Sequence, residues 1–493
     1  MSRRDLALIP IIAALVVHSL IYDFVSDDAF ISFVYSRNLA EHGELTFNLG
    51  DRVEGYTNFL WTVIIGGLMK LGVAPELSSR VLGTAFGAAT LVVLTRLTAR
   101  LRGGASAWDL LAPALLAASP GYACWCSGGL ETQMFTSFVV LGVYGLFAER
   151  PVLSGVSFAL SAMTRPEGLL VFGVAGLWRL ARCRLRIGRD ELVWGFAFLV
   201  PWAPWFAWRW WYYGWPFPNT FYVKAGGEPP PGYAARMRAN GLYYIWQWAW
   251  QSRALFAAPL ALFGAWRRPG FGALCLLLTV VYLGYAVSVG GDFMGLHRFV
   301  MPLFVTTALL TAGGVEALPG PRAVIAVVLV AAFVATNVGL IRASLVQTAD
   351  NGIDRPGYLE HYAETRGAIG RALAPHARPD DFAIFGGAGV QPYYSRIGGI
   401  DVFGLVSDDI AHHEPPTRPR AGHQKWAAPD RVLKYRPSFI FSCYDIHKEP
   451  SRYTLGCGEA GFFQARGYEP ITLYVPELGA YYSFLKRKDR PWP

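Results

Sequence analysis

Apolar segments separated by short polar ones run through the first 345 residues. The first segment, Leu6–Tyr22, follows Ser2-Arg3-Arg4 and precedes no small-residue cleavage site, which is typical of a retained first helix rather than a signal peptide. Because about 20 residues are needed to cross the hydrocarbon core, the pattern predicts a polytopic α-helical membrane protein. The further apolar runs occupy residues 58–73, 78–98, 107–122, 131–148, 152–164, 168–181, 191–211, 241–264, 270–288, 299–315 and 323–345.

Composition supports a membrane protein. Of the 493 residues, 53% are hydrophobic and only 16% are charged, against about 25% charged in soluble domains. Trp, Tyr and Phe are abundant, as expected of aromatic belts at membrane interfaces. The net charge of +9 comes mainly from short clusters between apolar runs. It is therefore read as a topology signal and not as a sign of nucleic-acid binding.

Basic clusters predict which loops face the cytoplasm. The stretch Arg182–Arg189 and the pair Arg267-Arg268 mark inside loops. If every apolar run crossed, Arg100 and Arg102 would fall on the wrong side, so we expect run 58–73 to lie in the interface. This leaves about eleven crossings in a bacterial cytoplasmic membrane, with the N-terminus inside and the C-terminus outside. Pro166 predicts a break between the two helices of residues 152–181.

The first outer loop, residues 23–56, begins with two adjacent carboxylates, Asp27 and Asp28. Charged groups at the mouth of a membrane span are costly and are often functional. The ordinary alternative is an interfacial acidic pair that caps the next helix. Residues Ala29–Glu41 carry Phe30, Phe33 and Val34 at helical spacing, which predicts an amphipathic helix along the membrane surface.

Composition changes after residue 345, where Pro, Asp, His, Arg and Gly become frequent. We expect a helical transmembrane domain over residues 1–345 and a mixed α/β extracytoplasmic soluble domain over 346–493. Its β-like runs are Phe382–Phe385, Ser438–Phe441 and Ile471–Tyr474. Cys443 and Cys457 fall in this domain, where an oxidising compartment permits either a disulfide or two free thiols.

Several polar motifs fall on the predicted outer side and together suit a lipid-linked sugar phosphate. Cationic side chains there would stabilise a phosphate leaving group, and a carboxylate would accept the proton of an acceptor hydroxyl. A soluble nucleotide-sugar donor does not fit, because no nucleotide-binding domain is recognisable. The candidate donor-binding residues are Arg165, Glu167, Asn219, Tyr222, Lys224, Asp292, His297 and Arg298.

Each of these side chains also has an ordinary structural interpretation. Arg165 and Glu167 could form a local ion pair at a hairpin tip, and Lys224 could extend its amine to the interface. His297 and Arg298 could be interfacial anchors. Glu131 could be a charge at a helix N-terminus, favoured by the helix dipole. Only their joint occurrence indicates a phosphate-binding, carboxylate-bearing cavity.

The motifs resemble those of the GT-C membrane glycosyltransferases, most nearly the terminal arabinofuranosyltransferases of mycobacterial cell-wall arabinan and the related pilin arabinosyltransferases. The resemblance covers nearly the whole chain. It rests on Asp27–Phe30, RVEGYTNFLW (Arg52–Trp61), SGGLET (Ser127–Thr132), TRPEGLL (Thr164–Leu170), PNTFYVK (Pro218–Lys224), GGDFMGLHRF (Gly290–Phe299) and GHQK (Gly422–Lys425).

The resemblance implies a polyprenyl-phosphate-linked donor of arabinofuranose and a cell-envelope glycan or glycoprotein acceptor. It also implies that the first-loop aspartates are catalytic, with the choice between Asp27 and Asp28 open. A divalent cation could assist, although the sequence gives no complete ligand set. The motifs add further residues with acceptor-binding or structural roles, namely Glu54, Tyr56, Asn58, Glu131, His423 and Lys425.

Other functions remain open at this stage. The same fold could use a lipid-phosphate mannose, glucose or aminoarabinose donor and modify protein or lipid A. A transporter of lipid-linked sugars would have inverted repeats and charges at the middle of the membrane, and neither is visible in the sequence. A membrane-anchored polysaccharide-binding protein would not need Asp27-Asp28 or the cationic loops.

Overall fold

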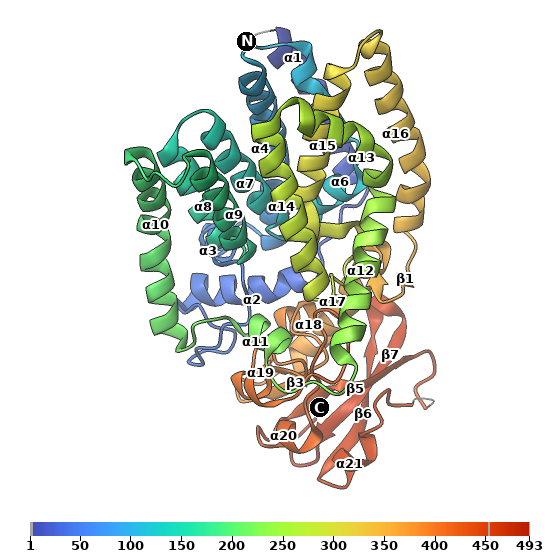
Figure 1. Cartoon of the computed structure of the whole chain (residues 1–493). Helices are drawn as coiled ribbons and strands as arrows, with labels where there is room; N and C mark the ends of the chain where they lie inside the picture. Colours follow the sequence, from blue (N-terminus) through green and yellow to red (C-terminus); the bar gives the residue numbers. More distant parts are fainter. Residues whose placement is uncertain (1–2, 452–453, 493) are drawn as a thin grey trace.

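The computed structural model describes residues 3–451 and 454–492. A bundle of helices occupies one end of the molecule, and a mixed α/β region formed by the last third of the chain occupies the other (Figure 1). The bundle consists of α1 (Arg3–Leu20), α3 (Phe59–Lys70), α4 (Pro75–Arg102), α5 (Leu111–Ala117), α6 (Pro120–Ser127), α7 (Thr132–Phe147), α8 (Pro151–Thr164), α9 (Glu167–Arg182), α10 (Arg189–Tyr213), α12 (Tyr233–Gln251), α13 (Ala254–Arg267), α14 (Pro269–Ser288), α15 (Met301–Ala317) and α16 (Arg322–Ser344).

The helices follow the apolar runs closely, but two of the runs are divided. The run 107–122 is divided between α5 and α6 at Ala118-Ser119. The run 241–264, expected as one span, is divided between α12 and α13 at Ser252-Arg253. Arg253 adopts a left-handed backbone conformation, φ 62°, which a continuous helix does not allow. The predicted break at Pro166 is confirmed, because α8 ends at Thr164 and α9 begins at Glu167.

Four segments of the described residues are long and apolar enough to cross a membrane, namely Pro75–Arg102, Pro269–Ser288, Gly295–Ala317 and Arg322–Ser344. A fifth candidate is the pair Ala107–Ala117 and Pro120–Ser127, which is bent by 69°. The helices α3, α7, α8 and α13 are apolar but shorter. The eleven crossings expected from the sequence therefore stay a prediction.

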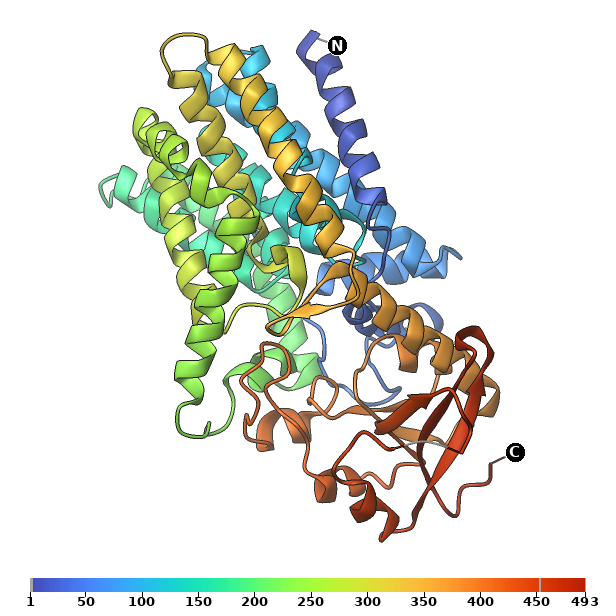
Figure 2. The same ribbon diagram turned by 90° about the vertical axis from the view of Figure 1, so that its right-hand side faces the viewer.

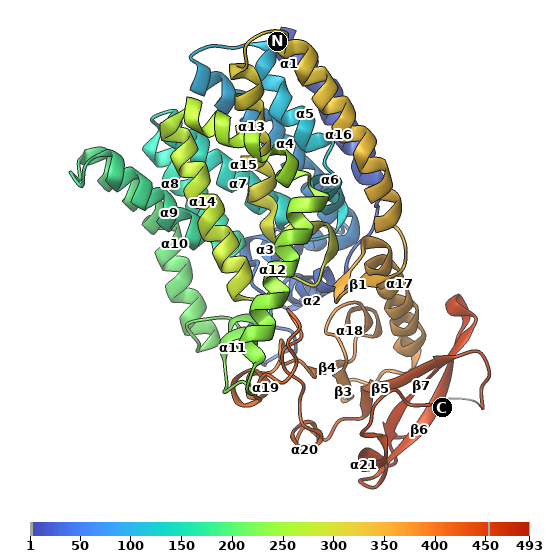
Figure 3. The ribbon, with the colours of Figure 1, turned by 45° about the vertical axis from the view of Figure 1, so that its right-hand side comes forward.

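The helix α2 (Asp27–His42) runs across the lower ends of the upright helices (Figure 1). The sequence predicted a helix here, but one with a free polar side at the membrane surface. Instead, every residue from Ala29 to Ser36 is buried, because α3 covers one side and α18 (Val390–Ser395) covers another (Figure 3). The helix is thus enclosed between the bundle and the mixed region.

The mixed region contains a five-stranded sheet in the order β4-β3-β5-β7-β6. Strand β3 pairs in parallel with β4 and β5, whereas β7 pairs antiparallel with β5 and β6. All three β-like runs of the sequence lie in strands of this sheet. Besides α18, the mixed region contains α17 (Pro356–Leu373), β3 (Phe382–Phe385), β4 (Gly398–Asp401), α19 (Asp408–His413), α20 (Pro429–Leu433), β5 (Phe439–His447), α21 (Ala460–Gln464), β6 (Tyr468–Val475) and β7 (Ala480–Arg487).

A short hairpin links the bundle to this region. Its strands, β1 (Ala349–Asp350) and β2 (Ile353–Asp354), lead from α16 into α17, as the side view shows (Figure 2). Within the mixed region Cys443 and Cys457 form a disulfide. This resolves an alternative that the sequence left open.

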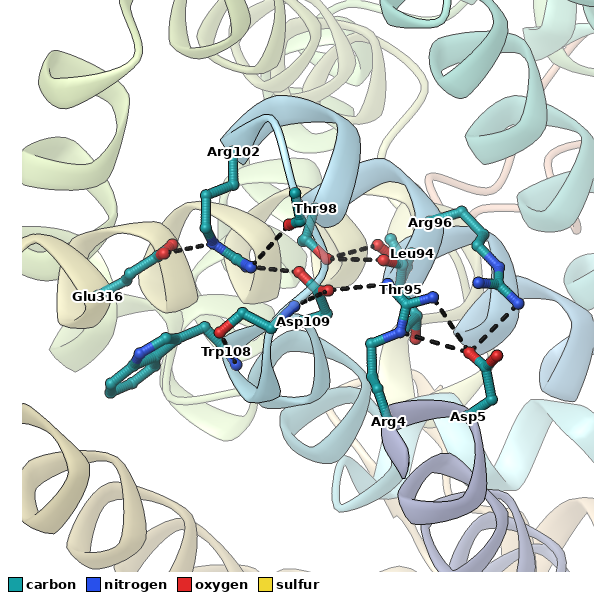
Figure 4. A network of polar contacts seen from close by, with 12 residues as sticks. Arg4, Asp5, Leu94, Thr95, Arg96, Thr98, Arg102, Trp108, Asp109 and Glu316 are labelled. Carbon is teal, nitrogen blue, oxygen red and sulfur yellow. Dashed lines mark hydrogen bonds and ion pairs between the residues drawn. The ribbon is translucent and has the colours of Figure 1, made fainter. Parts of the chain in front are cut away.

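Ion pairs tie together the end of the bundle far from the mixed region (Figure 4). The fully buried Asp109 carboxylate accepts hydrogen bonds from Arg4 at 3.0 Å and from Arg102 at 2.5 Å. Glu316 accepts from Arg102 at 2.6 Å and from Arg268 at 2.8 Å. Basic residues near the N-terminus, on α4 and after α13 therefore share one end, as the topology argument predicted. Which side of a membrane that end faces stays a prediction.

The cluster gives a test of bundle stability. Asp109→Ala removes the carboxylate that Arg4 and Arg102 share, and loss of one partner of a buried ion pair costs about 3 kcal/mol or more. We expect a clearly lower unfolding midpoint when tryptophan fluorescence is followed on heating in detergent. The control is Glu149→Ala, whose side chain is 86% exposed beside Arg100 and which should change stability by less than about 1 kcal/mol. Equal effects of the two substitutions would contradict a structural role for the cluster.

Candidate active site

A cavity of about 840 Å³ lies where the bundle meets the mixed region. One wall comes from the bundle, namely the turn between α8 and α9, the short helix α11 (Asn219–Ala225) and the segment leading into α15. The facing wall comes from α17 and from loops of the mixed region. The beginning of α2, with Asp27 and Asp28, lies between them. Residues of several of the predicted polar motifs thus line one cavity.

Asp27 is engaged by the mixed region. Its Oδ1 accepts a hydrogen bond from the backbone N–H of Val390 at 2.8 Å, at the start of α18. Gly389 precedes this N–H, and a Cβ there would clash with Asp27. Burial raises the pKa of Asp27, while the Val390 N–H and the Arg366 guanidinium oppose the rise. One carboxylate oxygen of Asp27 is therefore committed to holding α2 against α18.

Asp28 faces the cavity and a cation. Its Oδ2 lies 3.6 Å from Arg298 Nη2, and a third of its side chain is exposed. Arg298 is held from the other side by Asp292, whose Oδ2 accepts from Nε at 2.9 Å. Enclosure in the cavity raises the pKa of Asp28 to about 7, with the negative charges of Asp27, Asp292 and Glu131 adding to the rise and Arg298 opposing it.

Arg165 lies between two carboxylates. Its Nη1 donates to Glu131 at 2.8 Å, and its Nε donates to Glu167 at 3.3 Å. Glu131 in turn accepts from Asn58 at 2.8 Å, and the oxygen of Asn58 accepts from Ser32 of α2 at 3.0 Å. The charge of Arg165 is therefore largely balanced by protein groups, and this network connects α2 with the bundle wall.

Lys224 differs from Arg165 and Arg298, which carboxylates of the protein hold. It lines the cavity from α11, and within the described part of the chain no hydrogen bond or ion pair ties its ammonium group. Enclosure in the cavity lowers the pKa of Lys224, while the more distant carboxylates Glu167 and Asp292 oppose the fall. Lys224 is thus a cation available to an anionic ligand.

Three of the predicted donor-binding residues lie outside the cavity lining. Asn219 is buried and donates to the carbonyl oxygen of Leu405 at 3.3 Å, which ties α11 to the mixed region. Tyr222 packs among neighbouring aromatic rings. His297 is buried, and its Nε2 is hydrogen-bonded to Gln251 at 3.0 Å. Neighbours in the motif therefore point in opposite directions, because Arg298 enters the cavity whereas His297 does not.

The residues predicted to bind the acceptor or support the site also fall into two groups, one outside the cavity lining and one within it. Glu54 lies outside the lining and binds Arg209 of α10 at 2.9 Å and 3.0 Å, which fixes the first loop to the bundle. Lys425 is buried and donates to the carbonyl oxygen of Ala411 at 2.6 Å. Both are structural contacts. The residues of this group that do line the cavity are Tyr56, Asn58, Glu131 and His423.

The mixed region contributes cavity residues that the sequence reasoning missed. Tyr358 and Tyr362 lie one turn apart on α17, and Nη2 of Arg420 donates to both carboxylate oxygens of Asp354, at 2.9 Å and 3.0 Å. The four-residue spacing of the tyrosines was the only available signal. Residues 3–451 and 454–492 contain no group of three or more His, Cys, Asp or Glu side chains placed to hold a metal ion.

Comparisons with known proteins bear on both parts of the chain. Residues 356–489 match the family described as "Domain of unknown function (DUF8728)", which coincides with the mixed region. In sequence, the chain is 26% identical over 326 residues to the terminal β-(1→2)-arabinofuranosyltransferase of Corynebacterium glutamicum. This match covers 57% of the chain and 46% of the relative, so the chain spans less than half the length of that protein.

The structure resembles ArnT from Cupriavidus metallidurans along its full length. The TM-score is 0.65 for ArnT bound to undecaprenyl phosphate, with 12% identity and 97% of each chain covered. For apo ArnT it is 0.61, with 12% identity and 99% of each chain covered. The chain has a helical membrane fold like that of ArnT. The helical membrane fold predicted from the sequence, with its C-terminal mixed α/β region, is thus confirmed.

The contact between α2 and α18 gives a test of the cavity's construction. Gly389→Ala places a Cβ against the backbone and carboxylate of Asp27, and such overpacking typically costs about 1–3 kcal/mol. We expect a lower unfolding midpoint and faster proteolysis between the bundle and the mixed region. Gly387→Ala is the matched control, because its Cβ would meet Asp27 only at 3.4 Å, an ordinary contact. Equal stability of the two variants would contradict the tight contact described here.

Proposed function

We propose that this protein is a membrane glycosyltransferase that moves a sugar from a polyprenyl-phosphate donor to a cell-envelope acceptor. The observation that carries the proposal is the pairing of Asp28 with Arg298 at 3.6 Å in a large cavity. A carboxylate that can accept a proton and cations that can receive a phosphate lie within one enclosed space. Transfer of a sugar from a phosphate needs both at once.

The reaction would proceed as follows. The acceptor hydroxyl oxygen bonds to the anomeric carbon of the donor sugar, and the bond between that carbon and the phosphate oxygen breaks. The bonding electrons leave with the polyprenyl phosphate, and the hydroxyl proton passes to Asp28. Lys224 and Arg298 stabilise the negative charge that develops on the leaving phosphate. Arg165, already balanced by Glu131 and Glu167, would serve mainly to position this wall.

Asp28 suits the role of the base better than Asp27 does. Asp27 already uses Oδ1 to accept the Val390 N–H, and its displacement would separate α2 from α18. Asp28 is exposed to the cavity, and a pKa near 7 matches that of a general base at neutral pH. We therefore assign Asp27 a positioning role and Asp28 the proton transfer.

Two features support a lipid-linked donor and an outward-facing site. The structural neighbour ArnT was crystallised with undecaprenyl phosphate, and the cavity wall near α11 carries Phe217 and Phe221, whose exposed apolar rings suit a lipid chain. The basic cluster lies at the opposite end of the bundle, which favours an extracytoplasmic cavity by the positive-inside rule. D-Arabinofuranose is the sugar we propose, from the match to the Corynebacterium enzyme.

Substitution of the two aspartates separates their roles. Asp28→Asn should lower the rate of transfer from polyprenyl-phospho-arabinofuranose to an arabinan oligosaccharide by about 10²–10⁴-fold, the usual contribution of a general base. Asp27→Asn keeps a hydrogen-bonding oxygen for Val390 and should have a much smaller effect. Asp23→Asn is the control, because Asp23 lies in the same loop but pairs with Arg80 outside the cavity.

Binding of the lipid phosphate is measured in parallel, as thermal stabilisation of each variant by undecaprenyl phosphate. Retained stabilisation in Asp28→Asn would show that the loss of transfer is chemical. Full transfer activity in Asp28→Asn would overturn the assignment of the base. Transfer lost in Asp27→Asn and kept in Asp28→Asn would exchange the two roles.

The pKa of Asp28 predicts the pH profile. A base must be deprotonated to act, and burial raises the pKa of Asp28 to about 7. Therefore kcat/KM should be constant well above pH 7 and fall about tenfold per pH unit well below it. Initial rates between pH 5 and pH 9 in buffers of matched ionic strength test this. A rate that stays level down to pH 5 would contradict a base with a raised pKa.

A further inference from the structure

Two tyrosines on α17 form an aromatic surface that the donor chemistry does not use. Tyr358 and Tyr362 both line the cavity and are half-buried. Their ring centroids are 6.4 Å apart and their planes differ by 27°, so the two rings are stacked nearly parallel along the helix. They lie on the wall formed by the mixed region, apart from the bundle wall that carries Lys224 and Arg165.

The surface is held rigidly on its buried side. The guanidinium of Arg366, one turn further along α17, lies 5.2 Å from the ring centre of Tyr362 and 4.0 Å from that of Tyr444 on β5. Arg366 itself is buried. A cation over the aromatic face fixes the orientation of the ring. Tyr362 is therefore held in place before any ligand binds.

The aromatic surface begins beside Asp27, the neighbour of the proposed base. The hydroxyl of Tyr362 and Oδ2 of Asp27 both lie 3.4 Å from the point where a Cβ at Gly387 would stand. Beyond Tyr358, the other end of the surface approaches the ion pair of Asp354 with Arg420, whose charges both act on the Tyr358 hydroxyl. Aromatic faces thus lie in a row between two polar ends.

We propose that Tyr358 and Tyr362, with Asp354 and Arg420, form the subsite that binds the glycan chain of the acceptor. This assignment rests on the proposed function, because it places the acceptor opposite the donor phosphate. A sugar ring presents C–H groups on its face and hydroxyls around its edge. The C–H groups suit the negative face of a tyrosine ring, and the hydroxyls suit planar Asp and Arg side chains.

The position of the subsite fits the reaction. A glycan lying along Tyr358 and Tyr362 brings its end to Asp27 and Asp28, where its terminal hydroxyl meets the base. The donor phosphate occupies the opposite wall, near Lys224. A polyprenyl chain on the tyrosine surface is disfavoured, because it would lie against the charged Asp354–Arg420 pair, whereas Phe217 and Phe221 offer it apolar contacts.

The test uses full-length protein in nanodiscs and two readouts. In the transfer assay, Tyr358→Ala and Tyr362→Ala should each raise the KM for an arabinofuranose oligosaccharide by roughly tenfold, as loss of an aromatic contact allows. The KM for the donor should change by less than about twofold, because the donor binds the other wall. Tyr358→Phe and Tyr362→Phe should retain most of the affinity, since they keep the aromatic face.

The second readout needs no turnover. Saturation-transfer NMR with arabinofuranose, mannose and glucose oligosaccharides reports glycan binding directly, and the Ala variants should lose the signal seen with the wild type. The control is Tyr474→Ala, an exposed tyrosine on β6 away from the cavity. Unchanged acceptor KM in both Ala variants, an equal rise in donor KM, or no glycan signal in the wild type would overturn the subsite. Failure of the proposed function would instead appear as absent stabilisation of the wild type by undecaprenyl phosphate.

Discussion

The hydrogen bond between Asp27 and the backbone of Val390 joins residues 363 positions apart in the chain. It holds the first turn of α2 against the first turn of α18, with glycine at position 389 as the only residue that leaves room for the contact. A carboxylate at a helix N-terminus is well placed, because it satisfies an N–H that has no partner within the helix. This contact closes the cavity on one side and orients the neighbouring Asp28 toward its interior.

The three cations Arg165, Arg298 and Lys224 look equivalent in the sequence, but they differ in how many carboxylates of the protein balance their charge. A buried guanidinium is tolerated only when carboxylates surround it, and Arg165 meets this condition through Glu131 and Glu167. Arg298 is balanced by Asp292 and only loosely by Asp28. Lys224 has no such partner in the described residues. An incoming phosphate would therefore complete the charge balance around Lys224 and Arg298, whereas around Arg165 it would compete with groups already bound.

The sequence predicted what depends on local patterns. Apolar runs placed most of the bundle helices within a few residues, Pro166 placed a break, and short β-like runs placed three of the five strands of the large sheet. Four side chains from the polar motifs, Asp28, Arg165, Lys224 and Arg298, line one cavity. Each of these features depends on a local property of the sequence, namely the spacing of apolar residues, the effect of proline on the backbone, or the position of charged residues.

Long-range packing decided the rest. The burial of α2 depends on α18, a helix formed by residues 390–395, so its own residues predicted a surface helix. Asn219 and His297 belong to polar motifs, but each points to a partner outside the cavity. Asp27 and Asp28 have different contacts, because only Asp27 accepts the hydrogen bond of the distant Val390. Tyr358 and Tyr362 line the cavity because the fold packs α17 against it, which the local sequence does not indicate.

We propose that the cavity holds a polyprenyl phosphate with its phosphate between Lys224 and Arg298 and its sugar beside Asp28. The most direct measurement is a cryo-EM structure of the protein in nanodiscs with undecaprenyl phosphate. The account predicts phosphate density between Lys224 and Arg298, within about 4 Å of both cationic groups, with the isoprenoid chain leaving past Phe217 and Phe221. Phosphate density beside Arg420, or outside the cavity, would contradict it.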